Sequence, residues 1–282
     1  MKSFKSYYQI ISCFFFSLLG FQIKLELESS SIENIVFFRS LWGVIFLFII
    51  FFISKKTFAF RNYNFDNINI HFVRAIFGVL AMYFGYNSLN YLTLSQASTI
   101  AYTKIFFTTI LALVFFKEKI KLISVVLIFV GFSGIFLISN PTALDNNVGL
   151  YMSLFSALCV SGGILSISYL SKKEDTKNIL LNHSFFSTII FYLLFKEKIN
   201  LSLFLDHFNF LLITLTALAG QYFNTESFKS SPTNEVIILS YSRIIFSTGL
   251  GFFFLNETIS LQNFIGIILI AITTFSVKRK NT

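Results

Sequence analysis

Two basic residues lie in the middle of long apolar runs. Lys104 is the only charged residue between positions 96 and 116, and Arg243 is the only one between positions 236 and 255. A lysine or arginine at the centre of a lipid-embedded helix costs about 2.5–3.5 kcal/mol on insertion scales, so such residues usually have a function. The chemistry that suits them is anion recognition, because both bind carboxylate or phosphate through charge-assisted hydrogen bonds.

The sequence offers these two cations no acidic partner at the same depth. All 13 Asp and Glu residues lie in predicted loops or at the ends of apolar segments. An unpaired basic pair that faces a cavity is what an anionic or zwitterionic substrate needs. Three alternatives stay open: the two side chains bond to backbone carbonyls, they reach carboxylates near the membrane surface, or Lys104 is neutral.

Hydroxyl groups flank both basic residues. Tyr102 and Tyr241 come two positions earlier, which on a regular helix places them about 200° away from the cation. They either line another wall of the cavity or pack between helices. Thr108 and Ser247 follow the cations by four positions, so they share the same helix face and are candidates for contacts with the substrate.

Two further segments carry polar stripes at helical spacing. The stripes consist of Tyr83, Asn87 and Asn90 in one segment, and of Gln221, Asn224 and Thr225 in the other. Polar stripes in membrane helices line cavities or form hydrogen bonds with neighbouring helices. Because the two segments correspond to each other in the repeat described below, we expect both stripes to line the cavity and contact the substrate.

Three more side chains are candidates for contact with a substrate or a coupling ion. Arg39 lies one to two turns inside its apolar segment, where substrate gating and a structural bond to an acidic loop residue are both open. Arg74 lies at the predicted start of a segment, where we expect it to extend toward lipid headgroups. His183 is a single histidine near the start of another segment, which leaves a role in proton coupling open.

The elements that must position these residues are apolar helices. Of the 282 residues, 55% are hydrophobic and only 12% are charged, and the mean hydropathy is +0.74. This composition excludes an ordinary soluble domain and predicts an all-α integral membrane protein. A span needs about 20 apolar residues. We therefore expect ten transmembrane helices, at residues 7–23, 34–54, 75–92, 96–116, 122–139, 148–170, 179–195, 210–228, 235–255 and 262–277.

The distribution of basic residues predicts the orientation. The net charge of +9 does not indicate nucleic-acid binding, because the Lys and Arg fall in short clusters between the apolar segments. With the N-terminus in the cytoplasm, the inner loops and ends hold 16 Lys and Arg, whereas the outer loops hold 3. This asymmetry is typical of membrane proteins. We therefore expect both termini to be cytoplasmic.

The sequence contains an internal repeat. Thirteen of the 46 positions in residues 83–128 are identical to those 139 positions later, in residues 222–267. The identities include polar pairs such as Tyr102 with Tyr241, which shared apolar composition does not explain. Each half holds five predicted helices, so the second half inserts with the opposite orientation. We expect two inverted-topology repeats, residues 1–140 and 148–282, which together form one transmembrane domain.

Short motifs follow one another in a fixed order along the chain. They are Phe37-Phe38-Arg39-Ser40-Leu41, Arg74-Ala75-Ile76-Phe77-Gly78, Tyr86-Asn87-Ser88-Leu89, Ser95-Gln96-Ala97, Phe116-Lys117-Glu118-Lys119 and Leu255-Asn256-Glu257. With the repeat, they resemble the EamA-type, ten-span members of the drug/metabolite transporter superfamily. This resemblance implies secondary transport of a small metabolite by alternating access. In one departure from the family, Thr103-Lys104-Ile105 lacks the proline of many relatives, which leaves a kink or hinge at this point open.

These observations predict a secondary transporter for a small organic anion or an amino-acid-like solute. One alternative is a carrier of a zwitterionic or cationic metabolite, such as an amino acid or S-adenosylmethionine. Another is a non-transporting membrane accessory protein. We expect no enzymatic activity, metal or cofactor, because no catalytic or phosphate-binding motif is present. The expected partners are a small-molecule substrate and membrane lipid, without nucleic acid, and the sequence leaves a homodimer open. The Lys-, Asn-, Ile- and Phe-rich composition favours a bacterial inner membrane.

Overall fold

Helices make up the described chain. The structure, a computed structural model, describes residues 7–53, 67–116, 122–139, 147–203, 208–255 and 261–279, and none of these residues lies in a β-strand. The elements are α1 (Tyr7–Glu26), α2 (Ile32–Ile53), α3 (Ile68–Asn87), the 3₁₀-helix η4 (Ser88–Asn90), α4 (Leu94–Ala101), α5 (Lys104–Phe116), α6 (Leu122–Ser139), α7 (Asn147–Leu170), α8 (Thr176–Phe195), α10 (Phe208–Ser230), α11 (Thr233–Leu239), α12 (Ser242–Phe254) and α13 (Leu261–Arg279). The all-α prediction is confirmed over these ranges.

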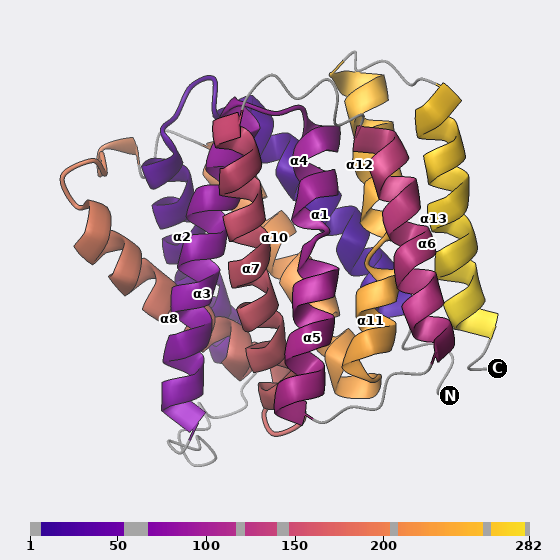
Figure 1. Cartoon of the computed structure of the whole chain (residues 1–282). Coiled ribbons are helices and arrows are strands. Elements are labelled where there is room, and N and C mark those ends of the chain that lie inside the picture. The colour runs from indigo at the N-terminus through magenta and orange to yellow at the C-terminus, as the bar shows by residue number, and fades with distance from the viewer. Residues whose placement is uncertain are drawn as a thin grey trace.

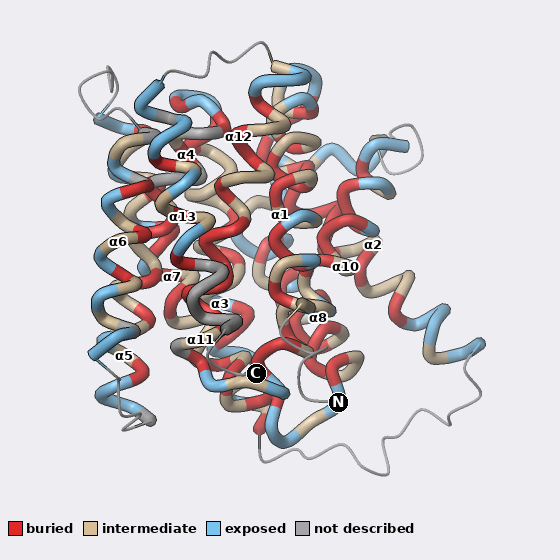
Figure 2. Tube along the Cα trace, turned by 90° about the vertical axis from the view of Figure 1, so that its right-hand side faces the viewer, coloured by how far each residue is buried: buried red, intermediate tan, exposed pale blue. Residues whose placement is uncertain are grey.

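The outer surface of the helices is apolar. Phe52 is 89% exposed, Phe253 is 75% exposed and Phe115 is 70% exposed. Figure 2 shows exposed residues along the outward faces of α5 and α6, while buried residues recur along α1 and α10. Apolar side chains on an outer surface indicate contact with lipid, where a helix satisfies all of its backbone hydrogen bonds internally. The chain is therefore a multi-pass membrane protein.

Six helical stretches are long and apolar enough, by length and composition, to cross a membrane. They are Tyr7–Glu26, Ile32–Ile53, Ile68–Asn90, Asn147–Leu170, Thr176–Phe195 and Glu235–Phe254. The expected ten spans all coincide with helical segments, but the count of ten stays a prediction. The basic clusters Lys55-Lys56 and Lys117-Glu118-Lys119, used to predict orientation, lie outside the described residues.

Two of the expected spans are interrupted at repeat-related positions. The first break separates α4 from α5 at Tyr102-Thr103, and the second separates α11 from α12 at Ser240-Tyr241. At both breaks a backbone N–H donates to the carbonyl three positions earlier, as in a 3₁₀-helix. Thr103 donates to the Ile100 carbonyl at 3.0 Å, and Arg243 donates to the Ser240 carbonyl at 3.1 Å. The chain therefore departs from regular α-helix without a proline.

Hydroxyl side chains explain these breaks. The Thr103 hydroxyl donates to the Ile100 carbonyl at 2.9 Å, the Ser240 hydroxyl donates to the Ile237 carbonyl at 2.6 Å, and the Ser242 hydroxyl donates to the Leu239 carbonyl at 2.9 Å. Ser and Thr that bond to a preceding carbonyl compete with the backbone ladder and bend helices. The absence of proline had left a kink at Thr103-Lys104-Ile105 open, and the helix is broken immediately before Lys104.

The helices pack in pairs that relate the two halves of the chain. Helix α3 packs along α7 and α1 packs along α10, while α6 lies beside α13 and α2 beside α8 (Figure 1). Helix α1 begins and α13 ends at the same end of the bundle in both overall views (Figures 1 and 2). The first two pairs enclose the centre of the molecule, and the broken helices pack against them.

A polar cluster ties α3 to the turn between α7 and α8. The Glu174 carboxylate lies 2.9 Å from Nε2 of His71 and accepts a 2.9 Å hydrogen bond from Asn67. Burial raises the pKa of the Glu174 carboxyl. The hydrogen bond and charge of His71 and the hydrogen bond of Asn67 lower it, and together they outweigh burial. The pKa of Glu174 therefore lies below its ordinary value. The folded protein therefore favours the charged carboxylate.

Replacing Glu174 by glutamine is expected to lower the apparent Tm at neutral pH by about 3–6 °C, because hydrogen bonds to a charged group contribute about 1.5–3 kcal/mol. A carboxyl whose pKa is lowered by folding stabilises the folded state at pH values above its unfolded-state pKa, which is about 4.3 for glutamate. This contribution disappears as the pH falls through the lower pKa of the folded state. Thermal unfolding at pH 7 and pH 4 checks both effects. A wild-type advantage that is equal at the two pH values would contradict the assignment.

Candidate substrate cavity

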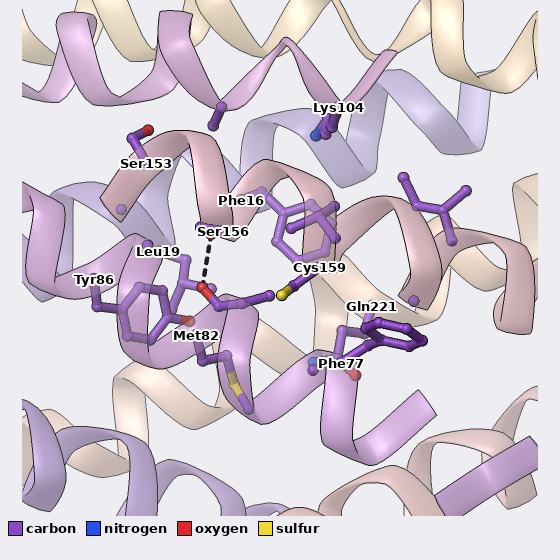
Figure 3. A pocket seen from close by; sticks show the side chains of 18 of the residues that line it. Phe16, Leu19, Phe77, Met82, Tyr86, Lys104, Ser153, Ser156, Cys159 and Gln221 are labelled. Carbon is purple, nitrogen blue, oxygen red and sulfur yellow. Dashed lines mark hydrogen bonds between the residues drawn. The ribbon is translucent and has the colours of Figure 1, made fainter. Parts of the chain in front are cut away.

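A cavity of about 250 Å³ lies at the centre of the bundle, where the paired helices α1, α3, α7 and α10 meet. Its wall is mostly apolar, with Phe16 and Leu19 of α1 facing Phe77 and Met82 of α3 (Figure 3). Small residues of α3 and α7, namely Ala81 and Gly163, line the space, and a Cβ added at Gly163 would meet no atom within 4 Å. The volume equals roughly eight water molecules at liquid density, which suits a small metabolite.

Lys104 and Arg243 both line this cavity. The Lys104 ammonium lies 4.7 Å from the centre of the Tyr102 ring, and the Arg243 guanidinium lies 5.7 Å from the centre of the Phe16 ring. Such cation–π contacts partly stabilise a charge that has left water. Arg243 Nε is buried and has no hydrogen-bond partner among the described residues. The two side chains are thus held in place while part of their donor capacity stays unused.

The backbone at these two positions is held in matching ways. The Lys104 carbonyl accepts a 3.0 Å hydrogen bond from Ser161 of α7, and the Arg243 carbonyl accepts a 2.9 Å hydrogen bond from Ser17 of α1. Both serines are fully buried. A helix of each half therefore fixes the basic residue of the other half, just after the break in its helix.

Three other predicted site residues lie on the cavity wall, namely Arg39, Gln221 and Asn224. Gln221 Oε1 is buried without a hydrogen-bond partner within the described chain. In contrast, the described lining contains no Asp or Glu. The cavity therefore presents cationic and amide groups on a largely apolar wall.

Family membership follows from the sequence match. A sequence model of the EamA-like transporter family matches the chain twice, over residues 5–140 and 147–278. The chain belongs to the EamA-like transporter family. Relatives of this EamA-family protein also carry transporter names, and the protein is a membrane transporter.

The relatives match over nearly their full length. The pseudopaline exporter CntI of Pseudomonas aeruginosa is 24% identical over 272 residues, which cover 96% of this chain and 94% of the exporter. An uncharacterized transporter of Helicobacter pylori is 22% identical over 265 residues, which cover 90% of this chain and 88% of the relative. A solved crystal structure with 14% identity has a TM-score of 0.70 and covers 94% of this chain and 98% of its own. It shows the same fold.

Tyr102 and Tyr241 of this EamA-family transporter lie in an apolar core between the halves. Their rings stack with centroids 5.8 Å apart. The Tyr102 hydroxyl donates to the Ser240 carbonyl at 2.6 Å, and the Tyr241 hydroxyl donates to the Ile128 carbonyl at 2.9 Å. Tyr102 also borders a space of about 30 Å³ next to Lys104 and Arg243. Of the two expected roles, the structure places these rings in packing between helices rather than on the main cavity.

Tyr102→Phe is expected to destabilise the protein by about 0.5–1.5 kcal/mol, because it removes one buried hydrogen bond and keeps the ring. Substrate affinity should change by less than about twofold. Chemical or thermal unfolding measures the first effect, and binding of the transported solute measures the second. A large loss of affinity at normal stability would instead make the hydroxyl a substrate contact.

The remaining predicted residues lie away from the main cavity. Thr108 is fully buried, and its hydroxyl has no partner among the described residues. Ser247 donates to Ser17 at 3.1 Å. The Tyr83 ring stacks on Phe195 at 4.9 Å, and Asn90 donates to Asn87 at the exposed end of α3. The structure thus places all five in helix packing or at a helix end.

Sequence reasoning missed several cavity residues. Arg74 was expected at the lipid headgroups, yet it is 3% exposed and lines the cavity. Tyr86, Ser156 and Cys159 line it as well, and so does His183, which the sequence had left open as a proton-coupling residue. Arg74 was misplaced because the predicted segment began at residue 75, whereas α3 begins at Ile68, nearly two turns earlier. Ser156 could have been identified from the sequence, because it is a small polar residue inside an apolar segment.

Proposed function

We propose that this protein is a secondary transporter that moves a small organic anion, or an amino-acid-like solute with a free carboxylate, by alternating access. The observation that carries the proposal is the position of Lys104 and Arg243 on one cavity that has no Asp or Glu in its described lining. A transported anion would supply the missing negative charge. Its departure would leave two cations in an apolar wall, so binding favours the anion strongly.

The helix arrangement supports alternating access. We propose ten spans in two inverted five-helix repeats, residues 1–140 and 148–282, with both termini in the cytoplasm of a bacterium and the spans in its inner membrane. The pairs α3 with α7 and α1 with α10 are then equivalent, and the breaks before Lys104 and near Arg243 place interrupted helices at the binding site. Transporters with inverted repeats bind substrates at such interruptions and move one repeat against the other.

The polar side chains of the cavity are suited to bind different parts of the solute. Lys104 offers a compact charge, while Arg243 offers a planar fork that suits a carboxylate. Gln221 and Asn224 on α10 supply neutral donors and acceptors for the rest of the solute. A purely cationic metabolite finds no counter-charge there. A zwitterion such as an amino acid is compatible through its carboxylate, and the exporter name of the Pseudomonas relative makes export the direction to test first.

Flux through reconstituted vesicles tests this proposal. Proteoliposomes containing the purified protein would be loaded with radiolabelled organic acids, amino acids or S-adenosylmethionine, and efflux would be compared with protein-free vesicles. We expect saturable efflux of at least one acid and none of simple cations. Efflux of cations alone would make the protein a cation carrier, and no efflux of any solute would favour an accessory protein. Either result would overturn the proposal.

A further inference from the structure

A second group of basic side chains lines the cavity, apart from Lys104 and Arg243. It consists of Arg39 from α2, Arg74 from α3 and His183 from α8. These residues are 6%, 3% and 8% exposed, respectively. Since no Asp or Glu lines the cavity in the described chain, this group also lacks an acidic partner there. The cavity therefore has more positive charge than one anionic group can neutralise.

Arg39 is buried but only partly satisfied. One of its terminal nitrogens contacts the sulfur of Met82, and its guanidinium lies 5.9 Å from the centre of the Tyr86 ring. Its Nε is buried without a hydrogen-bond partner among the described residues. A thioether is a weak acceptor. The contacts orient the guanidinium against the cavity wall but leave strong donor capacity for a ligand.

Arg74 and His183 complete this group from two other helices. Arg74 donates one hydrogen bond, 2.7 Å long, to the carbonyl of Ile179 on α8. The His183 ring fits against Gly78, one turn after Arg74, where an added Cβ would lie only 2.3 Å from the ring. The glycine thus leaves room for the imidazole against α3, and the Ser187 hydroxyl lies 3.4 Å from its Nδ1.

The two basic groups face each other across the cavity. Figure 3 shows Lys104 on one wall and Met82, the contact of Arg39, on the opposite wall. The apolar side chains of Phe16 and Phe77 and the thiol of Cys159 also line the space. Basic side chains thus border the cavity both at Lys104 and beside Met82, and apolar side chains make up much of the remaining wall.

We propose that the cavity binds a dianion whose two negative groups are separated by a short hydrocarbon chain, with a dicarboxylate as the simplest case. One carboxylate binds Lys104 and Arg243, and the other binds Arg39 and Arg74, with His183 as a further polar contact. The apolar part of the cavity wall packs against the hydrocarbon. This inference rests on the proposed function and adds a second anion-binding subsite to it.

Matched pairs of ligands test the second subsite. Binding of succinate, glutarate and adipate to the purified full-length protein in lipid nanodiscs would be compared by calorimetry with binding of their monoamides. The monoamide keeps the shape and loses one charge. For at least one chain length, we expect the diacid to bind at least about tenfold more tightly than its monoamide. Because the ratio is measured within one preparation, partial misfolding of a variant does not alter it.

Variants assign the effect to particular residues. Arg39→Gln and Arg74→Gln should reduce the diacid-to-monoamide ratio to about one, while Arg74→Lys should retain part of it. Lys104→Gln should weaken both ligands. A wild-type ratio near one at every length, a ratio unchanged in both glutamine variants, or no binding of any pair would overturn the second subsite. Monoamide binding that is insensitive to Lys104→Gln would instead contradict the first anchor, so the two failures are distinguishable.

Discussion

Transport of the anionic substrate should fall by at least about a hundredfold when Lys104 and Arg243 are both replaced by glutamine. Each substitution removes a charge-assisted contact worth about 1.5–3 kcal/mol, or roughly tenfold or more in affinity. Glutamine retains much of the side-chain length and removes two charges that are costly in an apolar wall. Folding and membrane insertion should therefore be preserved. Efflux from proteoliposomes, normalised to the amount of reconstituted protein, measures the loss.

Lys198→Gln is the matched control. Lys198 is a basic residue whose side chain is 64% exposed and pairs with Glu33 at 3.3 Å, a kind of surface contact that contributes little. It should transport like the wild type. Lys104→Arg should retain part of the activity because it keeps the charge with a different shape. If the double glutamine variant transported at the wild-type rate, these residues would not bind the substrate.

Filling the cavity should have the second largest effect. Gly163 lines the cavity on α7, and a Cβ added there meets no atom within 4 Å. The side chain of Gly163→Leu would therefore begin in open space and extend into the cavity. Overpacking of a bound ligand typically costs 1–3 kcal/mol, so we expect substrate affinity to fall about 10- to 100-fold. The variant should remain folded, because leucine favours helix more than glycine does.

Gly249→Leu provides the control for this substitution. Gly249 lies on α12, also meets nothing within 4 Å of an added Cβ, and does not line the main cavity. The same change in size and helix propensity should leave affinity and flux close to wild type. Calorimetry and flux on the two variants compare the sites directly. Equal affinity in Gly163→Leu and Gly249→Leu would mean that the substrate does not occupy this cavity.

The sequence predicted the helices well because lipid allows few alternatives. A long apolar segment must satisfy its backbone internally, so each expected span coincides with helix. The sequence did not predict the two helix interruptions, because proline was the only cause of a kink that we considered. The breaks come instead from local hydroxyl bonds of Thr103, Ser240 and Ser242. The competition between such bonds and the helix ladder depends on packing that a single segment does not reveal.

The sequence predicted those site residues that were selected by the free-energy cost of placing a charge in an apolar segment. Lys104 and Arg243 were selected because a charge in an apolar run is expensive, and both line the cavity. Predictions based on which helix face a residue shares with Lys104 or Arg243 were less accurate. Thr108 shares the predicted face of Lys104, yet it is fully buried against neighbouring helices. The face that a helix turns toward the cavity depends on how the helices pack together, and the periodicity of a single helix does not determine this packing.

A structure of the protein with its transported anion bound would test the central claim most directly. We predict that oxygens of one anionic group lie about 2.7–3.2 Å from Lys104 Nζ and from a guanidinium nitrogen of Arg243, inside the cavity between α3 and α7. An anion bound elsewhere, or bound in this cavity without contact to either residue, would contradict the account.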